Sequence, residues 1–377
     1  MDAPTAAGLA LGTAADLLLA DPRRGHPVAV FGAAAAALER RVWRDSRPAG
    51  ALYAAALTAA AAGAGVALDR GTRERPAARA LVTAAGTWAV LGGTSLGRAA
   101  AVLSRALGAG DLAAARAALP ALAGRDPRHL DADELARATV ESVAENTSDA
   151  AVAPLFWGAV AGLPGLLGYR AVNTLDAMVG YRSPRYARFG WAAARADDAV
   201  NWLPARLTAV LTVVCAPLVG GSAAGALRAW LRDGAAHPSP NAGRCEAAAA
   251  GALGLRLGGR NVYGGRVEER PQLGSGRPRC PPTSTRPCGC RARCGSRPPW
   301  RPFRRLSGGQ DGTDGEDSTG GRRNRPGTPR FPGSRSAPGA RGPYRPGIGA
   351  AGCPWQPVGV GIETAGTASC RTPPVPL

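Results

Sequence analysis

The sequence predicts an all-α, polytopic membrane protein with four to five hydrophobic segments and a disordered C-terminal tail. A helix needs about 20 mostly apolar residues to cross a bilayer. Four uncharged stretches approach this length: Gly50–Leu68, Ala80–Gly97, Ala150–Tyr169 and Leu207–Leu227. Their many Ala and Gly residues suit close packing of membrane helices, although a large soluble bundle tolerates the same composition. The Arg and Asp residues at their borders favour the membrane.

A fifth apolar stretch, Ala6–Ala20, is shorter and contains Asp16. No basic residue precedes it, so we do not expect a cleaved signal peptide. Arg is abundant in every connection, and counting positive residues therefore gives no clear sidedness.

The composition changes near residue 275. Residues 275–377 hold 17 of the 46 Arg residues but only five of the 27 acidic ones, and Gly, Pro, Arg and Ser dominate. Such a segment buries too little apolar surface to offset its ordering entropy. We therefore predict a membrane domain over residues 1–274 and a disordered tail over residues 275–377. Arg-rich tails can bind nucleic acid, but this one lacks interleaved aromatics and regular spacing, so no nucleic-acid partner is expected.

The tail also has the signature of out-of-frame translation. The codons of Cys288, Cys290, Cys294 and Trp300 all begin with T, and T at the second codon position always specifies an apolar residue. A frame slip near residues 275–282 would place apolar residues at these steps, with polar or small ones between them. That spacing is typical of an amphipathic helix.

Several classes of chemistry are excluded. Every cation is Arg and the chain has no Lys, so neither a Walker-type phosphate loop nor a Schiff-base enzyme is possible. Six of the eight Cys lie in the tail without a paired CxxC or a His, which argues against a zinc site.

The first motif with chemical potential is ESVAENTSDAAVAP, residues 141–154, on a helix that Asp131 or Asp133 would cap. Glu141, Glu145 and Asp149 follow one another at four-residue spacing and share one helix face. Like charges at this spacing repel, and Mg²⁺ prefers a few carboxylates together with substrate phosphates. We predict these three residues as metal ligands; the alternative is a solvated acidic helix end.

The second motif covers residues 169–190 and 194–207. Its Asn and Asp residues lie among apolar neighbours, and its Arg side chains suit phosphate or carboxylate ligands. We predict that it binds substrate through Asn173, Asp176, Arg182, Arg185, Asn201 and Arg206. A juxtamembrane cluster that binds anionic lipid would explain the Arg residues, but not the Asp and Asn residues.

The third motif is HPSPNAG, residues 237–243, in which two prolines hold an extended turn. We predict ligand contacts from His237, Ser239 and Asn241. The alternative, which also applies to the earlier DPRRGHPV, is a plain connector between helices. An Ala-rich helix, Glu246–Leu257, is expected to follow and to end at Gly258 and Gly259.

Together these strings resemble the CobD/CbiB family, adenosylcobinamide-phosphate synthase. The resemblance runs from Leu11 to about Gly274. Its most specific parts are ENTSD with APLFW, NTLDAMVGYR, DDAVNWLPARL, HPSPNAG and AGALGLRLGG. Arg244 and Cys245 depart from it, because Trp-Pro or a similar pair is expected after HPSPNAG.

The resemblance implies a multi-pass enzyme of the cell's inner membrane that acts in cobalamin biosynthesis. It would join a carboxyl of adenosylcobyric acid to (R)-1-aminopropan-2-ol or its O-phosphate, with ATP and Mg²⁺ as cofactors. Activating a carboxylate by phosphoryl transfer requires positive charge on the phosphates. Glu141, Glu145 and Asp149, or Asp197 and Asp198, would hold Mg²⁺.

The remaining roles follow from the same implied reaction. Arg182, Arg185 and Arg206 would clamp phosphate, and His237 would assist the amine's proton loss. The predicted catalytic residues are Glu145, Asp198 and His237, and Asn241 joins the predicted substrate-binding residues. A polytopic transporter and a non-catalytic scaffold for corrinoid enzymes are the competing functions.

This site can form only if Ala150–Tyr169 is not a straight crossing. A straight helix would separate the acidic motif from NTLDAMVGYR by the whole membrane. The segment contains Pro154, Gly162 and Pro164 among other helix breakers, and broken membrane helices often line sites. We predict a break within it.

Overall fold

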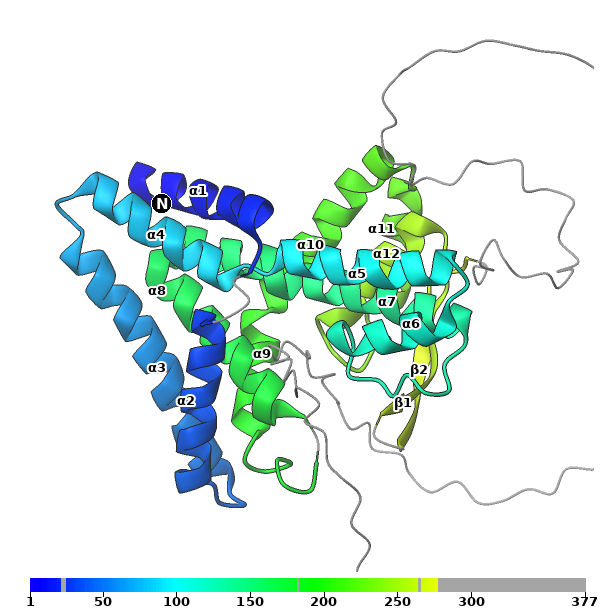
Figure 1. Cartoon of the computed structure of the whole chain (residues 1–377), viewed down its shortest axis with the longest axis horizontal. Helices are drawn as coiled ribbons and strands as arrows, with labels where there is room; N and C mark the ends of the chain where they lie inside the picture. Colours follow the sequence, from blue (N-terminus) through cyan, green and yellow to red (C-terminus); the bar gives the residue numbers. More distant parts are fainter. Residues whose placement is uncertain (22–24, 182, 264–265, 277–377) are drawn as a thin grey trace, which may run out of the picture. The chain divides into compact units, whose positions relative to one another are not determined.

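The computed structural model describes residues 1–21, 25–181, 183–263 and 266–276 (Figure 1). Its N-terminal half consists of α1 (Ala3–Leu19), α2 (Pro27–Val42), α3 (Arg47–Gly71), α4 (Pro76–Val90), α5 (Gly93–Gly108), α6 (Leu112–Ala118), η1 (Leu119–Ala121), α7 (Ala132–Thr147) and η2 (Ser148–Val152). The rest consists of α8 (Ala153–Leu175), η3 (Asp176–Gly180), α9 (Trp191–Val200), α10 (Trp202–Cys215), η4 (Ala216–Val219), α11 (Ala223–Asp233), α12 (Ala242–Leu253), β1 (Leu257–Tyr263) and β2 (Arg266–Leu273). The all-α prediction is confirmed, with one antiparallel hairpin added. The predicted tail lies outside the described residues from residue 277 onward.

Side chains that accept from free backbone N–H groups fix where several helices begin. Asp131 caps α7 in a reciprocal capping box: the Glu134 N–H donates to Asp131 Oδ1 at 2.8 Å, and the Asp131 N–H donates to Glu134 Oε2 at 3.0 Å. This settles the predicted choice between Asp131 and Asp133. Asp2 caps α1 and Ser222 caps α11 in the simpler, one-way manner.

Four helical runs in the described part of the chain are long and apolar enough to cross a membrane: Arg47–Gly71, Pro76–Gly108, Ala132–Gly180 and Trp202–Val219. Only 11% to 33% of the residues in their most apolar windows are buried in the protein. Large apolar side chains such as Leu52, Leu81 and Val214 are well exposed. Apolar surface of this extent suits contact with lipid, and the chain is a polytopic membrane protein as predicted.

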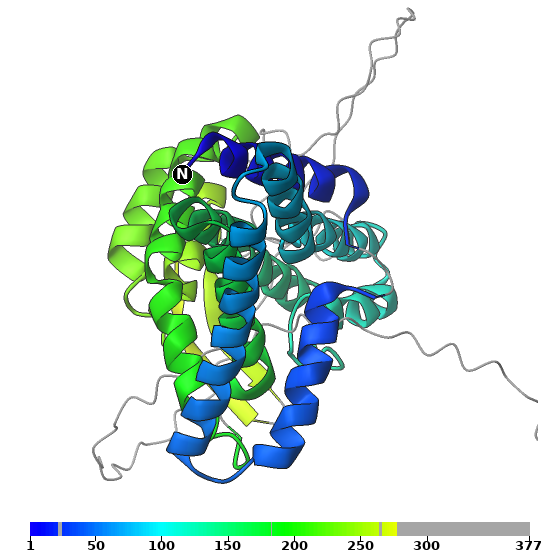
Figure 2. The same cartoon turned by 90° about the vertical axis from the view of Figure 1, so that its left-hand side faces the viewer.

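Close backbone approach joins neighbouring helices. Gly8 and Gly12 of α1 face Thr83 and Thr87 of α4 so closely that an added Cβ would lie within 2.5 Å of a Thr Cβ. Figure 2 shows α2 and α3 side by side, joined by the turn after Val42. The helix α3 also packs along α8, and α11 packs along α12. Small residues make these contacts possible, as expected for membrane helices.

The predicted break in Ala150–Tyr169 is confirmed. Within α8, Ala161 has φ −129° and ψ 15°, and Gly162 has φ 63° and ψ −151°. The Gly162 conformation is open almost solely to glycine, and Pro164 follows two residues later without an N–H to donate. The chain therefore changes direction halfway along α8.

The predicted apolar stretch Ala80–Gly97 lies within the run Pro76–Gly108, which α4 and α5 form together. Two predicted boundaries were wrong. Leu207–Leu227 is not one helix, because the chain turns at Gly220, with φ 74°, between η4 and α11. The helix predicted to end at Leu257 ends at Leu253, where Gly254 adopts the left-handed conformation with φ 63°. The residues that follow form β1 and β2, which were not predicted.

Candidate active site

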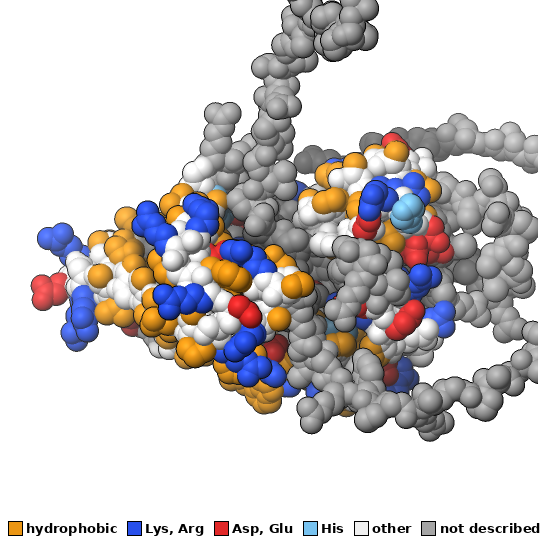
Figure 3. Space-filling model, turned by 90° about the horizontal axis from the view of Figure 1, so that it is seen from below, with side chains coloured by type: hydrophobic (Ala, Val, Ile, Leu, Met, Phe, Trp, Pro, Cys, Tyr) orange, Lys and Arg blue, Asp and Glu red, His pale blue; other side chains and the backbone are white. Residues whose placement is uncertain are grey.

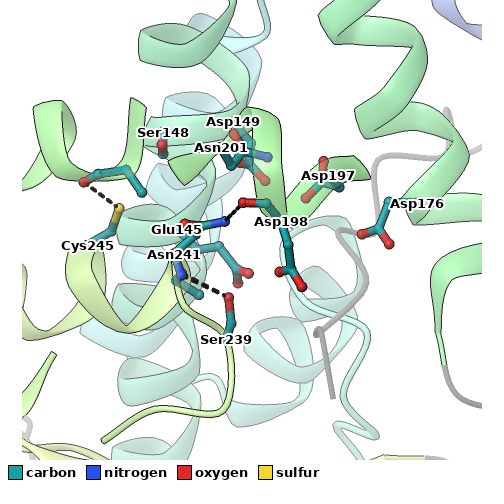
Figure 4. A pocket seen from close by; sticks show the side chains of 12 residues that line it. Glu145, Ser148, Asp149, Asp176, Asp197, Asp198, Asn201, Ser239, Asn241 and Cys245 are labelled. Atoms are coloured by element: carbon teal, nitrogen blue, oxygen red, sulfur yellow. Dashed lines mark hydrogen bonds between the residues drawn. The ribbon is translucent and has the colours of Figure 1, made fainter. Parts of the chain in front are cut away.

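A cavity forms where the three predicted motifs meet (Figure 4). The acidic motif supplies lining residues from the end of α7 and from η2. The NTLDAMVGYR motif supplies one from η3, and the DDAVNWLPARL motif supplies others from α9 and α10. HPSPNAG contributes from the loop before α12 and from α12 itself. The lining residues are Glu145, Ser148, Asp149, Asp176, Asp197, Asp198, Asn201, Ala205, Ser239, Asn241, Ala242 and Cys245.

Two π-helical turns carry carboxylates of this cavity. Asp149 lies in η2 and Asp176 lies in η3. A π-turn inserts a residue into a helix and is frequent at functional sites. The turns, together with the break at Gly162, let both ends of α8 contribute to one cavity.

Asn173 links the acidic side chains. Its Nδ2 lies 3.4 Å from Asp149 Oδ2 and 3.4 Å from Asp197 Oδ1. The buried Arg170 donates from Nη1 to Asn173 Oδ1 at 3.3 Å, which orients the amide so that its N–H groups face the carboxylates. Nearby, the Tyr169 hydroxyl donates to Asn201 Oδ1 at 3.0 Å.

The HPSPNAG loop is fixed against the cavity by its own polar groups. Ser239 Oγ accepts from the N–H groups of Asn241 at 3.3 Å and of Ala242, the first residue of α12, at 3.1 Å. Asn241 donates from Nδ2 to the backbone carbonyl of Asp198 at 2.8 Å. The loop is thereby joined to the end of α9 that carries the paired carboxylates.

Carboxyl side chains dominate the cavity. Five lining residues are carboxylates, and none of the described lining residues is a cation. Burial raises the pKa of Asp197 to about 6, against the opposing effect of hydrogen bonds from Asn201 and Asn173. Burial also raises the pKa of Asp198, while Arg195, whose Nη1 lies 3.8 Å from Asp198 Oδ2, lowers it. The cavity is therefore suited to a cationic guest.

The described side chains of the cavity do not form a closed metal site. Among the described residues, no three His, Cys, Asp or Glu side chains converge tightly enough to enclose a metal ion. Two oxygens of the cavity lining, Asp176 Oδ1 and Asn241 Oδ1, are buried without a hydrogen-bond partner among the described residues. Mg²⁺ keeps several waters and binds through only one or two carboxylates, so a metal held here would depend on single side chains of the lining and on water.

Glu141, a predicted metal ligand, is not brought to the cavity. Its Oε2 forms a buried ion pair with Arg125, and its Oε1 accepts from the Gly258 N–H at 2.7 Å. Both carboxylate oxygens therefore serve to hold β1 and Arg125 against α7. Helical spacing put Glu141 on the same face as Glu145, but the hairpin that covers that turn was not predicted.

The predicted phosphate-binding Arg residues also lie elsewhere. Arg185 pairs with Glu39, with Nη2 2.9 Å from Oε1. Arg206 donates to the Trp202 carbonyl at 2.7 Å and stacks on the Trp202 ring. Neither is among the lining residues, and Arg182 lies outside the described residues.

His237 lies behind the cavity wall. Its Nδ1 accepts from the Ser239 N–H at 3.1 Å, and its Nε2 lies 3.3 Å from Arg270 Nη1 and 3.9 Å from Glu246 Oε1. Burial and the charge of Arg270 lower the pKa of His237 to about 4. The residue is thus a buried, neutral support of the loop and not part of the cavity lining.

Ser148, Tyr169 and Cys245 belong to the site or its wall but were not predicted from the sequence. Cys245 is buried in the cavity wall with its thiol 3.6 Å from the Ala205 carbonyl. Ser148 shares the π-turn with Asp149. The sequence gives one indication for Tyr169, because it is a polar aromatic residue directly before Arg170. Its hydrogen-bond partner Asn201 lies 32 residues away along the chain, so the contact itself could not be predicted.

Comparisons with known proteins show which family the chain is similar to. The family model described as CobD/Cbib protein matches residues 9–288. The Cobalamin biosynthesis protein CobD of Mycobacterium tuberculosis strain H37Rv is 56% identical over 273 residues, which cover 72% of this chain and 86% of that protein. Proteins of the same name from Pelobacter propionicus and Geobacter metallireducens are each 46% identical, covering 71% and 72% of this chain and 84% and 87% of theirs.

No solved structure matches the chain. The family match takes in all residues of the cavity lining, and the identity with the relatives is far above the level at which a shared fold is in question. The chain therefore belongs to the CobD/CbiB family.

Proposed function

We propose that this chain catalyses ATP-dependent amide-bond formation in cobalamin biosynthesis at the cell's inner membrane. It joins a carboxyl of adenosylcobyric acid to (R)-1-aminopropan-2-ol or its O-phosphate, giving adenosylcobinamide or its phosphate. Family membership supports the role in cobalamin biosynthesis. The observation that supports a metal-dependent reaction of ATP is the cavity with five carboxyl side chains in its lining, because carboxylates are the protein ligands that Mg²⁺ uses together with substrate phosphates.

The proposed reaction has two steps. A carboxylate oxygen of the corrinoid attacks the γ-phosphorus of ATP, and the bond between this phosphorus and the β–γ bridging oxygen breaks. ADP departs, and the corrinoid carries an acyl phosphate. The amine nitrogen then attacks the acyl carbon, inorganic phosphate leaves with the C–O electron pair, and the nitrogen gives up a proton. Bound Mg²⁺ would supply positive charge to the phosphates during such a transfer.

The residues of the cavity divide among these tasks. We assign Glu145 and Asp149 to holding Mg²⁺, because they lie one helical turn apart and face the same cavity. Asn173 and Asn201 orient neighbouring carboxylates through their amides. We assign acceptance of the amine's proton to Asp198 and not to His237, because His237 does not line the cavity.

The test uses the full chain in lipid nanodiscs with adenosylcobyric acid, ATP, Mg²⁺ and either amine. Mass spectrometry of the corrinoid product and release of ADP are measured together. The proposal expects product with both readouts dependent on adenosylcobyric acid. Corrinoid binding without ADP release or product in an intact, folded chain would instead favour a transporter or a scaffold.

A further inference from the structure

One end of the α2–α3 pair carries a concentration of exposed Arg side chains that the cavity does not use. It is formed by the end of α2, the start of α3 and the loop before α9. We call it the basic end, and its members are Arg40, Arg41, Arg44, Arg47, Arg185 and Arg188, all exposed. The view from below in Figure 3 shows Arg side chains on this face among apolar ones.

The acidic residues there do not balance this charge. Glu39 is buried and pairs with Arg185, and Asp45 lies 3.9 Å from Arg188 through its Oδ2. Among the described residues, no carboxylate lies within ion-pair distance of the other four Arg side chains of this end. The opposite end of α3 differs, because Asp69 and Glu74 accompany the Arg residues 70, 73 and 75 there.

Aromatic residues hold the basic end in a defined form. The Arg185 guanidinium stacks 4.5 Å from the Trp43 ring centre, and Trp43 Nε1 donates to the Arg185 carbonyl at 3.3 Å. The Arg47 guanidinium lies 5.3 Å from the ring centre of Trp191, which is 43% exposed. Trp with adjacent Arg is the composition of the membrane–water interface.

The basic end is also continuous with the lipid-facing surface. Arg47 is the first residue of α3, a candidate membrane span. Leu52 of the same helix is 73% exposed and lies about 8 Å further along its axis. The cations are therefore at headgroup level when the apolar side of α3 is in the acyl chains.

We propose that the basic end binds the headgroups of anionic phospholipids through Arg40, Arg41 and Arg44, with Trp43 and Trp191 at the interface. Such a surface attracts acidic lipid by charge and is screened by salt. The proposal is independent of the reaction assigned to the cavity.

The test is quenching of Trp fluorescence in nanodiscs whose lipid carries brominated acyl chains. The full chain is compared in brominated phosphatidylglycerol and brominated phosphatidylcholine mixtures of equal bromine content. We expect stronger quenching by the phosphatidylglycerol mixture, and loss of this preference in the triple variant R40Q/R41Q/R44Q. The matched control R70Q/R73Q/R75Q removes the same charge from the other end of α3 and should keep the preference.

Equal quenching by the two lipids, or a preference retained by the R40Q/R41Q/R44Q variant and lost by the control, would overturn the proposal. If the R40Q/R41Q/R44Q variant does not fold, the salt dependence of quenching is measured with the unaltered chain instead. The preference for phosphatidylglycerol should then fall as NaCl is raised, and a salt-independent preference contradicts it.

Discussion

The side-chain amide of Asn173 lies 3.4 Å from a carboxylate oxygen of Asp149, although the two residues stand on opposite sides of the break in α8. In a straight helix, 24 residues would separate them by about 36 Å. The contact exists because the chain changes direction at Ala161 and Gly162. The geometry of the cavity therefore depends on a backbone conformation that only glycine adopts readily.

The first prediction concerns Gly162. The variant Gly162→Ala should lower the stability by about 1–3 kcal/mol, because its φ of 63° with ψ of −151° is strained for any residue with a Cβ. The added Cβ would also lie 3.3 Å from Asp69 Oδ2. Thermal unfolding in detergent measures the change, and product formation should fall with it.

Gly63→Ala is the matched control, since Gly63 lies within α3 and a Cβ added there would meet no other atom within 4 Å among the described residues. It should be neutral or slightly stabilising, because Ala favours a helix more than Gly does. Equal melting temperatures for Gly162→Ala and Gly63→Ala would show that the break is not needed.

The second prediction separates the cavity carboxylates from other acidic residues. Glu145→Gln and Asp198→Asn should each reduce product formation by about 100-fold or more, the usual contribution of a positioned acid or base. Their melting temperatures should not fall, because each change removes a negative charge from a crowded acidic site. Glu74→Gln, at an exposed position, is the control for product formation, and full activity in both cavity variants contradicts the site.

The third prediction concerns Glu141, which helical spacing assigned to the metal. Because its carboxylate pairs with buried Arg125 and accepts from Gly258, Glu141→Gln should cost about 3–5 kcal/mol of unfolding free energy. The Mg²⁺ concentration for half-maximal activity of the folded fraction should not change. Titration of Mg²⁺ against activity checks this, and a large rise in that concentration without a loss of stability would restore Glu141 to the metal site.

The sequence was sufficient to predict the helical membrane fold, the break in α8 and most of the side chains that gather at the cavity. Charge-free length and helix breakers are local signals, and they identify α3, α8 and α10 without knowledge of the packing. The places of Glu141 and His237 were not predictable in this way. Both are decided by β1, β2 and their residues Gly258 and Arg270, and a short Gly-rich hairpin lacks the alternation that identifies a strand. Helical spacing shows which residues share a face, but not what covers that face.

The fourth prediction follows from the buried His237. Its folded-state pKa of about 4 lies below the ordinary 6.5, because burial and Arg270 disfavour the charged form. Well above pH 6.5 the residue is neutral in both states and has no effect on the pH dependence. Between pH 6.5 and about 4 the unfolded chain takes up a proton that the folded chain does not, so stability falls by up to about 1.4 kcal/mol per pH unit.

The measurement is the melting temperature of the chain and of His237→Gln between pH 7.5 and 4.5, a range of about three units that brackets the ordinary His pKa. Glu246 and Arg270 face the imidazole and remain in both proteins, so the difference between the two curves isolates the His237 contribution. The variant should lose less stability on acidification than the parent. Parallel curves would mean that His237 titrates normally in the folded state.

The fifth prediction concerns the gene. The family match extends to residue 288, and the Mycobacterium tuberculosis relative is matched over 86% of its length against 72% of this chain. A frame slip near codons 275–282 would account for an abrupt change to Arg, Pro and Cys there. The T-first codons of Cys288, Cys290, Cys294 and Trp300 become apolar residues at helical steps in the neighbouring frame.

Re-sequencing should reveal an insertion or deletion at these codons, and the corrected chain should extend the similarity to its relatives. The change begins next to Leu273 of β2, which packs in a cluster with Ala247 and Leu257. Because the restored segment would continue from this packed hairpin, the corrected chain should also melt at a higher temperature than the 377-residue chain. An uninterrupted single frame, read from an independent isolate of the same gene, contradicts the hypothesis.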